Sequence, residues 1–222
     1  MTVKTLVVAP HPDDEVLGVG GTLLRRKAAG ANVAWLIVTA ISVESGWSAG
    51  KVKERADEIE RVTELFGFNE VFSLNFPTTQ LDQVPMSDLV ARISDVFKLF
   101  EPEEVFVPHP SDVHTDHRIV FDAVASCTKW FRYPSVKRIL AYETLSETDF
   151  GLGNNQGFRP NVFVDIEHFL EGKLRALDIY ASELGVFPFP RSHEAVQALA
   201  TLRGAASGFK LAEAFELLRE RS

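Results

Sequence analysis

Residues 5–15 have the sequence TLVVAPHPDDE, in which a short apolar run is followed directly by a histidine and three acidic residues. A short, continuously apolar run is typical of a strand that is buried on both faces of a parallel sheet. The segment from Val16 to Ala29 that follows has the length and polarity pattern of a helix. The stretch therefore predicts a strand, a polar turn and a helix in succession.

Apolar runs and helix-period segments alternate in the same way as far as Glu143. Further strands are expected at 33–39, 70–74, 104–107 and 136–142, and helices at 51–66, 87–100 and 115–131. Such a succession indicates a Rossmann-like, doubly wound α/β fold, with a mostly parallel sheet and helices on both faces. No shift in composition marks a boundary, so we expect a single domain over residues 1–222.

The alternation of apolar runs and helix-period segments does not continue in the remaining part of the chain. We expect a long loop at 145–160, an edge strand at 161–166, a helix at 169–184 and a break at 185–190. The charged segment 213–221 has the composition of an amphipathic helix, and helical structure is predicted for the chain beyond the break.

The overall composition excludes several classes of protein. With 45% hydrophobic residues the chain is not disordered, and a net charge of −8 without a basic cluster argues against nucleic-acid binding. No apolar segment approaches the ~20 residues that membrane insertion needs, and no signal peptide is recognised, so we expect a cytoplasmic protein. The single cysteine leaves His, Asp and Glu as the available metal ligands.

A second polar cluster follows the expected strand at 104–107. Residues 109–117 have the sequence HPSDVHTDH, so that four of the six histidines lie in the two clusters. In a sheet of order 3-2-1-4-5 the first and fourth strands are neighbours, and ligands bind beyond their carboxyl ends where the order reverses. We therefore expect the two clusters to meet.

The residue types in these clusters favour a metal site. His11 and Asp14 are three positions apart, as are His114 and His117, and one histidine of the second pair would complete a His-Asp-His site. Zn²⁺ in such a site would generate a nucleophile from water at neutral pH, although Fe²⁺ is also suited to these ligands. The competing interpretation is that aspartates at a helix start are simple caps.

Two carboxylates next to the expected ligands have the right chemistry for catalysis. Asp13 can accept a proton from the water. Asp116 can accept a hydrogen bond from the histidine that does not bind the metal and keep it protonated.

The segments HPDDE at 11–15 and HTDH at 114–117 resemble the two signature motifs of the PIG-L/LmbE-like zinc-dependent N-acetylglucosaminyl deacetylase family. The resemblance covers most of the chain and implies that zinc is bound by His11, Asp14 and His117. One departure is Arg118, which stands where the second motif often has a further histidine.

The resemblance also implies catalytic and substrate-binding roles. Asp13 would be the general base, and His114, oriented by Asp116, would stabilise the oxyanion and protonate the leaving amine. Family members similarly place an arginine near Arg55, so this residue is expected to contact the substrate. Tyr142 and Glu143 end the fifth strand on the same rim and are further candidates for substrate contact.

We therefore expect a hydrolase that removes the N-acetyl group from an amino sugar or an N-acetylglucosamine-containing conjugate. The alternatives are an amide or ester hydrolase of another pathway, such as a thiol-conjugate amidase, and a non-catalytic nucleotide- or sugar-binding module. The partner would be this small molecule, and the phenylalanines at 187 and 189 would suit a pocket cover or a homo-oligomer contact.

Overall fold

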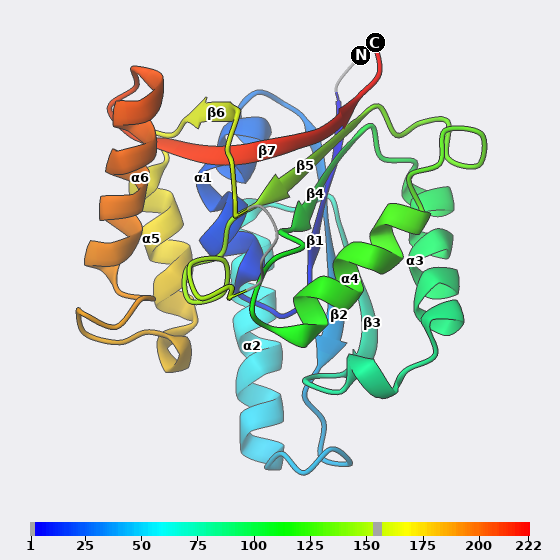
Figure 1. Ribbon diagram of the computed structural model, residues 1–222. Coiled ribbons are helices and arrows are strands. Elements are labelled where there is room, and N and C mark those ends of the chain that lie inside the picture. The colour runs from blue at the N-terminus through cyan, green and yellow to red at the C-terminus, as the bar shows by residue number, and fades with distance from the viewer. Residues whose placement is uncertain (1–2, 153–156) are drawn as a thin grey trace.

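The computed structural model describes residues 3–152 and 157–222 of the chain (Figure 1). In this part, seven strands form one sheet in the order β3-β2-β1-β4-β5-β7-β6. The first five strands along the chain are parallel, as predicted, and they have the predicted order 3-2-1-4-5. The strands are β1 (Lys4–Ala9), β2 (Asn32–Ala40), β3 (Glu70–Pro77), β4 (Glu104–Pro108), β5 (Arg138–Tyr142), β6 (Val162–Asp165) and β7 (Ala212–Glu220).

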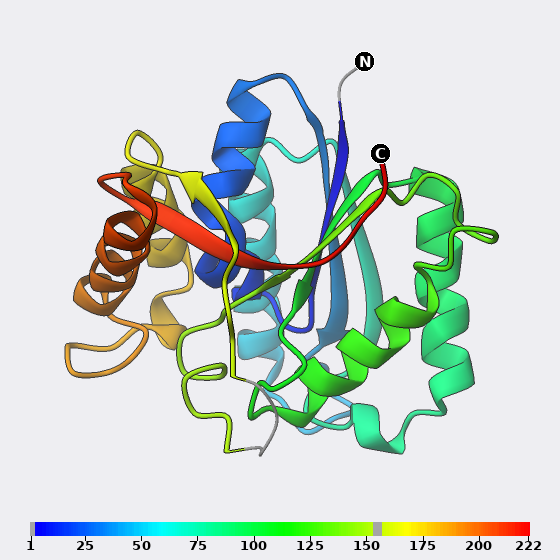
Figure 2. The same ribbon diagram turned by 45° about the horizontal axis from the view of Figure 1, so that its top comes forward.

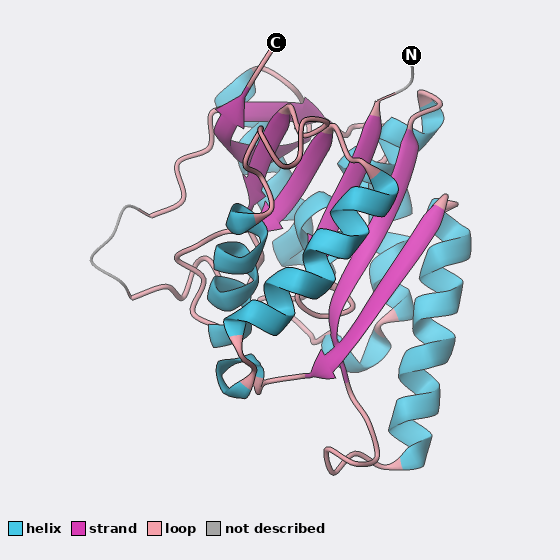
Figure 3. Ribbon diagram, turned by 90° about the vertical axis from the view of Figure 1, so that its right-hand side faces the viewer, coloured by secondary structure: helices cyan, strands magenta, loops and turns pink. Residues whose placement is uncertain are grey.

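Helices pack on both faces of the sheet and bury one hydrophobic cluster on each side (Figures 1 and 3). One face carries α1 (Asp14–Ala28), α2 (Ala49–Phe66), α5 (Leu170–Ile179) and α6 (His193–Ser207). The other face carries α3 (Met86–Phe100) and α4 (Thr115–Ser126). This arrangement confirms the doubly wound α/β fold. None of the described helices has the length and apolar character needed to cross a membrane.

The prediction of a helix at 213–221 is wrong. The segment forms β7, which lies between β5 and β6 and is antiparallel to both (Figure 2). Its alanine, glutamate and leucine residues favour a helix, but helix propensities differ by less than about 1 kcal/mol per residue. Pairing along both sides and burial of Phe215 outweigh such differences. The predicted loop at 145–160 contains no helix or strand in its described part, and residues 153–156 lie outside it.

A buried ion pair from the C-terminal half of the chain contacts the backbone of α1. Nζ of Lys173 is 2.6 Å from Glu213 and donates a hydrogen bond to the carbonyl of Leu17. Glu213 in turn accepts hydrogen bonds from the N–H groups of Gly21 and Thr22. In an undisturbed α-helix the N–H of residue 21 would bond to the carbonyl of residue 17. The pair therefore contacts both partners of one helical hydrogen bond and fixes the middle of α1.

Candidate functional site

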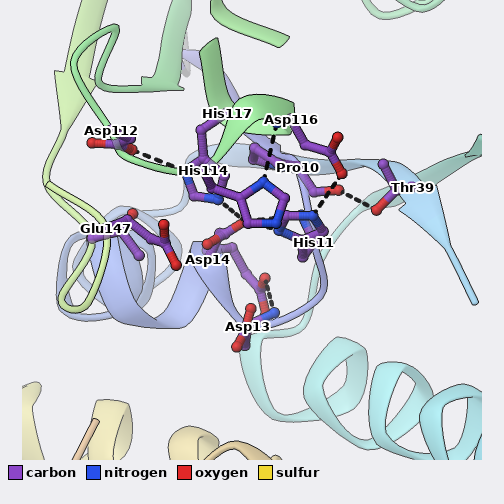
Figure 4. Close-up of polar contacts among 12 residues, drawn as sticks. Pro10, His11, Asp13, Asp14, Thr39, Asp112, His114, Asp116, His117 and Glu147 are labelled. Atoms are coloured by element: carbon purple, nitrogen blue, oxygen red, sulfur yellow. Dashed lines mark hydrogen bonds and ion pairs between the residues drawn. The ribbon is translucent and has the colours of Figure 1, made fainter. Parts of the chain in front are cut away.

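The two polar clusters meet at the carboxyl ends of the neighbouring strands β1 and β4. The first cluster forms the turn into α1, and the second forms the loop and the first turn of α4. The imidazole ring of His11 lies 4.6 Å from that of His114 and 5.3 Å from that of His117, measured between ring centroids (Figure 4). The structure thus brings together the six residues predicted for metal binding and catalysis: His11, Asp13, Asp14, His114, Asp116 and His117.

Asp14 lies between two of these histidines. Its Oδ2 atom is 3.5 Å from Nδ1 of His11 and 3.3 Å from Nε2 of His117. One ligand atom from each of the three residues lies within 4.8 Å of the others. Two imidazole nitrogens and one carboxylate oxygen are a usual donor set for catalytic Zn²⁺ and for non-haem Fe²⁺. The three residues therefore fit a divalent transition metal, and we call them the His-Asp-His group.

A second group, formed by His11, His114 and Asp116, satisfies the same spacing. The carboxylate of Asp116 is already engaged, because it accepts hydrogen bonds from the backbone N–H groups of Thr79 and Leu81. Its Oδ2 atom is also 3.0 Å from Nε2 of His11. Since few lone pairs remain on this carboxylate, the second group is the poorer cation site.

Each histidine of the His-Asp-His group contacts a carboxylate through its other ring nitrogen. Asp116 contacts His11 in this way, and Oδ2 of Asp112 is 2.9 Å from Nδ1 of His117. Such carboxylates fix the orientation of a ligand histidine and raise the basicity of the nitrogen that faces a metal. The predicted hydrogen bond from the His114 ring to the Asp116 carboxylate is absent from the described contacts, because this carboxylate contacts His11 instead.

The electrostatics of the His-Asp-His group favour positive charge. Burial opposes protonation of His11, but hydrogen bonds to Asp116 and Asp14 outweigh it and raise the pKa to about 9. Burial also opposes protonation of His117, but the negative charge of Asp14 and the hydrogen bond to Asp112 outweigh it and raise the pKa to about 10. The pKa of Asp14 lies well below its usual range, since attraction by His117 overcomes burial. A divalent cation would be stabilised by the same negative charges.

Asp13 has an unusual backbone and an unusual environment. Its φ angle is 127°, in a region that residues with a side chain rarely adopt, and its side chain is almost fully buried. Burial, together with the negative charge of Asp14, raises the pKa of Asp13 to about 7. Strained residues of this kind occur frequently at active sites. A carboxyl group with this pKa can both accept and release a proton at neutral pH.

Arg191 contacts Asp13 and was not identified from the sequence. Its Nη1 atom is 2.9 Å from Oδ2 of Asp13 and 3.4 Å from Glu183, and its Nη2 atom is 3.4 Å from Glu147. The positive charge of Arg191 opposes the effect of burial on the pKa of Asp13. The only sequence signal was the proline-flanked break at 185–190, which predicts a loop but assigns no partner to the arginine that follows it.

His114 is held by the start of α4. Its Nδ1 atom accepts a hydrogen bond from the backbone N–H of Asp116 at 3.1 Å, so His114 caps the helix. Burial and the nearby charges of His11 and His117 lower its pKa to about 4. The lowered pKa favours a neutral ring, which would carry its proton on Nε2, over the expected protonated histidine.

A pocket of about 390 Å³ opens beside the His-Asp-His group and includes Asp13 and His114 in its lining. Arg55, which the family resemblance led us to expect as a substrate contact, also lines it and donates hydrogen bonds to the carbonyl of Pro12 and to Glu183.

The structure does not bring Tyr142 and Glu143 to this pocket. The Tyr142 side chain is fully buried and its hydroxyl donates to the carbonyl of Val8, so this residue cannot contact a ligand there. Glu143 forms two hydrogen bonds with Arg203 and lies outside the pocket lining. The strand end was correctly located, but side chains alternate in direction along a strand and Tyr142 is directed into the core.

The fold and the site together define a doubly wound α/β protein with a His-Asp-His group at the switch point of its sheet. The family model described as "PIG-L: GlcNAc-PI de-N-acetylase" matches residues 6–128. This match spans more than half of the chain, which therefore belongs to the PIG-L family.

Similar proteins agree with this assignment. The chain is 27% identical to the diacetylchitobiose deacetylase of Thermococcus kodakarensis, over 95% of this chain and 81% of that protein. It is 28% identical to the uncharacterized deacetylase YaiS of Escherichia coli, over 80% and 90% of the two chains. The crystal structure of the conserved protein TT1542 from Thermus thermophilus matches with a TM-score of 0.80 at 29% identity, over 100% and 97% of the two chains.

Proposed function

We propose that this protein is a metal-dependent N-deacetylase that hydrolyses the acetamide of an amino sugar or its conjugate, releasing acetate and a free amine. The observation that carries the proposal is the position of Asp13 and His114 beside the His-Asp-His group in one pocket. Its PIG-L family membership and the deacetylase names of its relatives support the same reaction.

His11, Asp14 and His117 would hold the metal, for which Zn²⁺ is our first choice and Fe²⁺ the alternative. When bound, the ion would acidify a water molecule and polarise the amide carbonyl. The carboxylates of Asp112 and Asp116 would keep the two imidazoles in their ligand orientation.

The protein's own residues would carry the proton transfers. Asp13 takes a proton from the attacking water as the new carbon–oxygen bond forms. His114 donates a hydrogen bond from Nε2 to the carbonyl oxygen while negative charge develops on it. When the carbon–nitrogen bond breaks, Asp13 returns its proton to the amine nitrogen. A neutral His114 fits this division of roles, in which the histidine donates a hydrogen bond and Asp13 moves the proton.

One further charged residue of the pocket, Arg55, would position the substrate. Arg55 is partly exposed in the pocket lining, and we propose that it contacts a sugar hydroxyl. An amino sugar is the preferred substrate class because the T. kodakarensis relative is named for diacetylchitobiose.

Acetate release from a panel of substrates, combined with metal analysis of the purified protein, tests the proposal. The panel contains N-acetylglucosamine, its methyl glycoside and diacetylchitobiose, with a matched O-acetyl sugar and an N-acylated thiol conjugate. We expect about one metal ion per chain and acetate release from at least one amino sugar. Turnover restricted to the ester or to the thiol conjugate would favour another hydrolase. Tight sugar binding without turnover or metal would favour a binding module.

A further inference from the structure

The first half of α2 presents an apolar stripe to the pocket. Val52, Ala56 and Ile59 are spaced four and three positions apart, so they lie on one side of the helix, and all three line the pocket. A stripe of this spacing normally packs into the core. In α2 the buried apolar residues are Val62 and Phe66, near the other end of the helix. Ala56 is exposed and Val52 is partly exposed, whereas Ile59 is partly buried and also packs against the core cluster.

The segment between β2 and α2 adds two more apolar side chains to the same wall, Ile41 and Trp47. The tryptophan is 43% exposed, although its turn is well held. Its backbone N–H donates to the carbonyl of Ser42, and the next residue, Ser48, caps α2 through its side chain. A large aromatic side chain held in solvent by an ordered turn is a typical ligand contact.

Besides the reactive end, the pocket lining contains an apolar wall, which consists of Ile41, Trp47, Val52, Ala56 and Ile59. Polar side chains complete the lining outside the reactive end and this wall, among them Thr39, Ser73, Asn75, Thr78 and Thr79. The amide must lie at the reactive end, beside Asp13 and the His-Asp-His group. A sugar ring is covered with hydroxyls, for which four of these side chains offer no hydrogen-bond partner and the Trp47 indole offers a single N–H donor. The volume of about 390 Å³ falls within the range of pockets that enclose drug-sized ligands.

We propose that the natural substrate carries an apolar alkyl or aryl group on its acetylated amino sugar, and that the apolar wall binds this group. The inference rests on the proposed function and narrows its substrate class. Such a group can be attached in two ways, as the aglycone or as an extension of the N-acyl chain. Burial of each additional methylene against the wall would raise kcat/KM about fourfold until the wall is covered.

Two substrate series, assayed with the Zn²⁺-loaded full chain, test the inference. The first contains methyl, ethyl, propyl and butyl glycosides of N-acetylglucosamine, and the second contains N-acetyl, N-propanoyl and N-butanoyl forms of the methyl glycoside. We expect kcat/KM for amine release to rise about fourfold per methylene in one series, and that series identifies the point of attachment. Flat or falling values in both series, with the methyl glycoside hydrolysed, would overturn the inference but leave the deacetylase function intact.

If no member of either series is hydrolysed, the proposed function fails and binding decides the inference separately. Titration calorimetry of the same compounds should then give affinities that increase with chain length in one series. Equal affinities across both series would overturn the inference that the apolar wall binds an apolar group.

The variant Ala56→Asn tests the location of the binding surface. It introduces a polar amide at an exposed helical position of the wall, so the ratio of kcat/KM between the longest and the shortest substrate should fall to nearly one. Trp47→Ser provides a second variant, which lies outside the helix and should lower the same ratio at least threefold. The matched control is Ala205→Asn, at an exposed position of α6 outside the pocket lining, and it should keep the wild-type ratio. A wild-type ratio in both wall variants would contradict the proposal.

Discussion

The two polar clusters reach the same point of the fold with different local structures. The first cluster makes a strained turn, with a φ angle of 127° at Asp13, before α1 begins at Asp14. The second enters α4 through an ordinary cap, in which His114 accepts the backbone N–H of Asp116. The strained backbone therefore lies at the proposed base, and the regular helix start supports the residues around it.

The carboxylates of the two clusters also differ in their ability to exchange protons. Burial raises the pKa of Asp13 to about 7 and that of Glu15 to about 8. Asp116, in contrast, accepts hydrogen bonds from His11 and Thr79, which overcome its burial and lower its pKa. Two of the three carboxyl groups of the first cluster, Asp13 and Glu15, can thus change their charge near neutral pH, whereas Asp14 and Asp116 stay ionised. We infer that Asp13 of the first cluster performs the proton transfers, whereas Asp112 and Asp116 of the second orient the ligand histidines.

The largest change in kcat is expected for Asp13→Asn, which removes the proposed base and keeps a side chain of the same size. We expect kcat for acetate release to fall about 10²- to 10⁴-fold, because an amide does not accept the proton of the attacking water. The metal content, measured on the same sample, should stay at the wild-type level. A kcat near that of the wild type would exclude Asp13 as the base.

A smaller effect, on the affinity for Zn²⁺, is expected for Asp112→Asn and Asp116→Asn. Each variant loses a carboxylate behind a ligand histidine, so the Kd for Zn²⁺ should rise about 10- to 100-fold in a chelator competition assay. Asp122→Asn, at an exposed position of α4, is the matched control and should keep the wild-type Kd. If Asp116→Asn bound Zn²⁺ normally but lost kcat, Asp116 would act on His114, as the family resemblance implied.

The pH dependence of kcat/KM in Arg191→Gln tests how the positive charge of this arginine affects Asp13. Asp13 must be ionised to accept a proton, so kcat/KM falls as the pH drops below its pKa. Removal of the positive charge of Arg191 disfavours the carboxylate and raises this pKa, which moves the acidic limb of the profile to higher pH. A shift of one pH unit would reduce the rate on that limb about tenfold.

Arg203→Gln is the control for this profile. Its partner Glu143 lies outside the pocket lining, so the acidic limb should remain where it is. An unshifted limb in Arg191→Gln would mean that Arg191 does not influence the titrating group.

The smallest effect is expected outside both clusters, for Tyr142→Phe. This change leaves the buried carbonyl of Val8 without its hydroxyl donor and should lower the free energy of unfolding by about 1 kcal/mol, measured by urea denaturation. The kcat and KM values should remain within about twofold of the wild type, because the side chain is in the core. A large rise in KM would restore Tyr142 as a substrate contact.

The parallel half of the sheet was predictable because its signals are local. Each buried strand is a continuous apolar run and each following helix has its own period, so order and direction follow from the doubly wound rule. The antiparallel half was predicted less well. Ala212–Glu220 has helix-forming residues, and only its pairing with β5 and β6, which lie far away in the sequence, makes it a strand.

The candidate site was likewise predictable only where its signals are local. The meeting of the two clusters followed from the strand order, since both come directly after strands. The contacts of Arg191 with Asp13 and of Asp116 with His11 depend on side-chain directions that no spacing in the sequence specifies. Local patterns thus identified the residues at the centre of the site, and tertiary packing determined which of them touch.

The ion pair between Lys173 and Glu213 has a consequence for the order in which the protein can assemble during synthesis. Glu213 accepts a hydrogen bond from Gly21, 192 positions earlier in the chain, within the helix whose first turn carries Asp14. A nascent chain that contains both polar clusters still lacks the carboxylate that fixes this helix. The contacts that Glu213 makes with α1 can therefore form only after β7 has emerged from the ribosome.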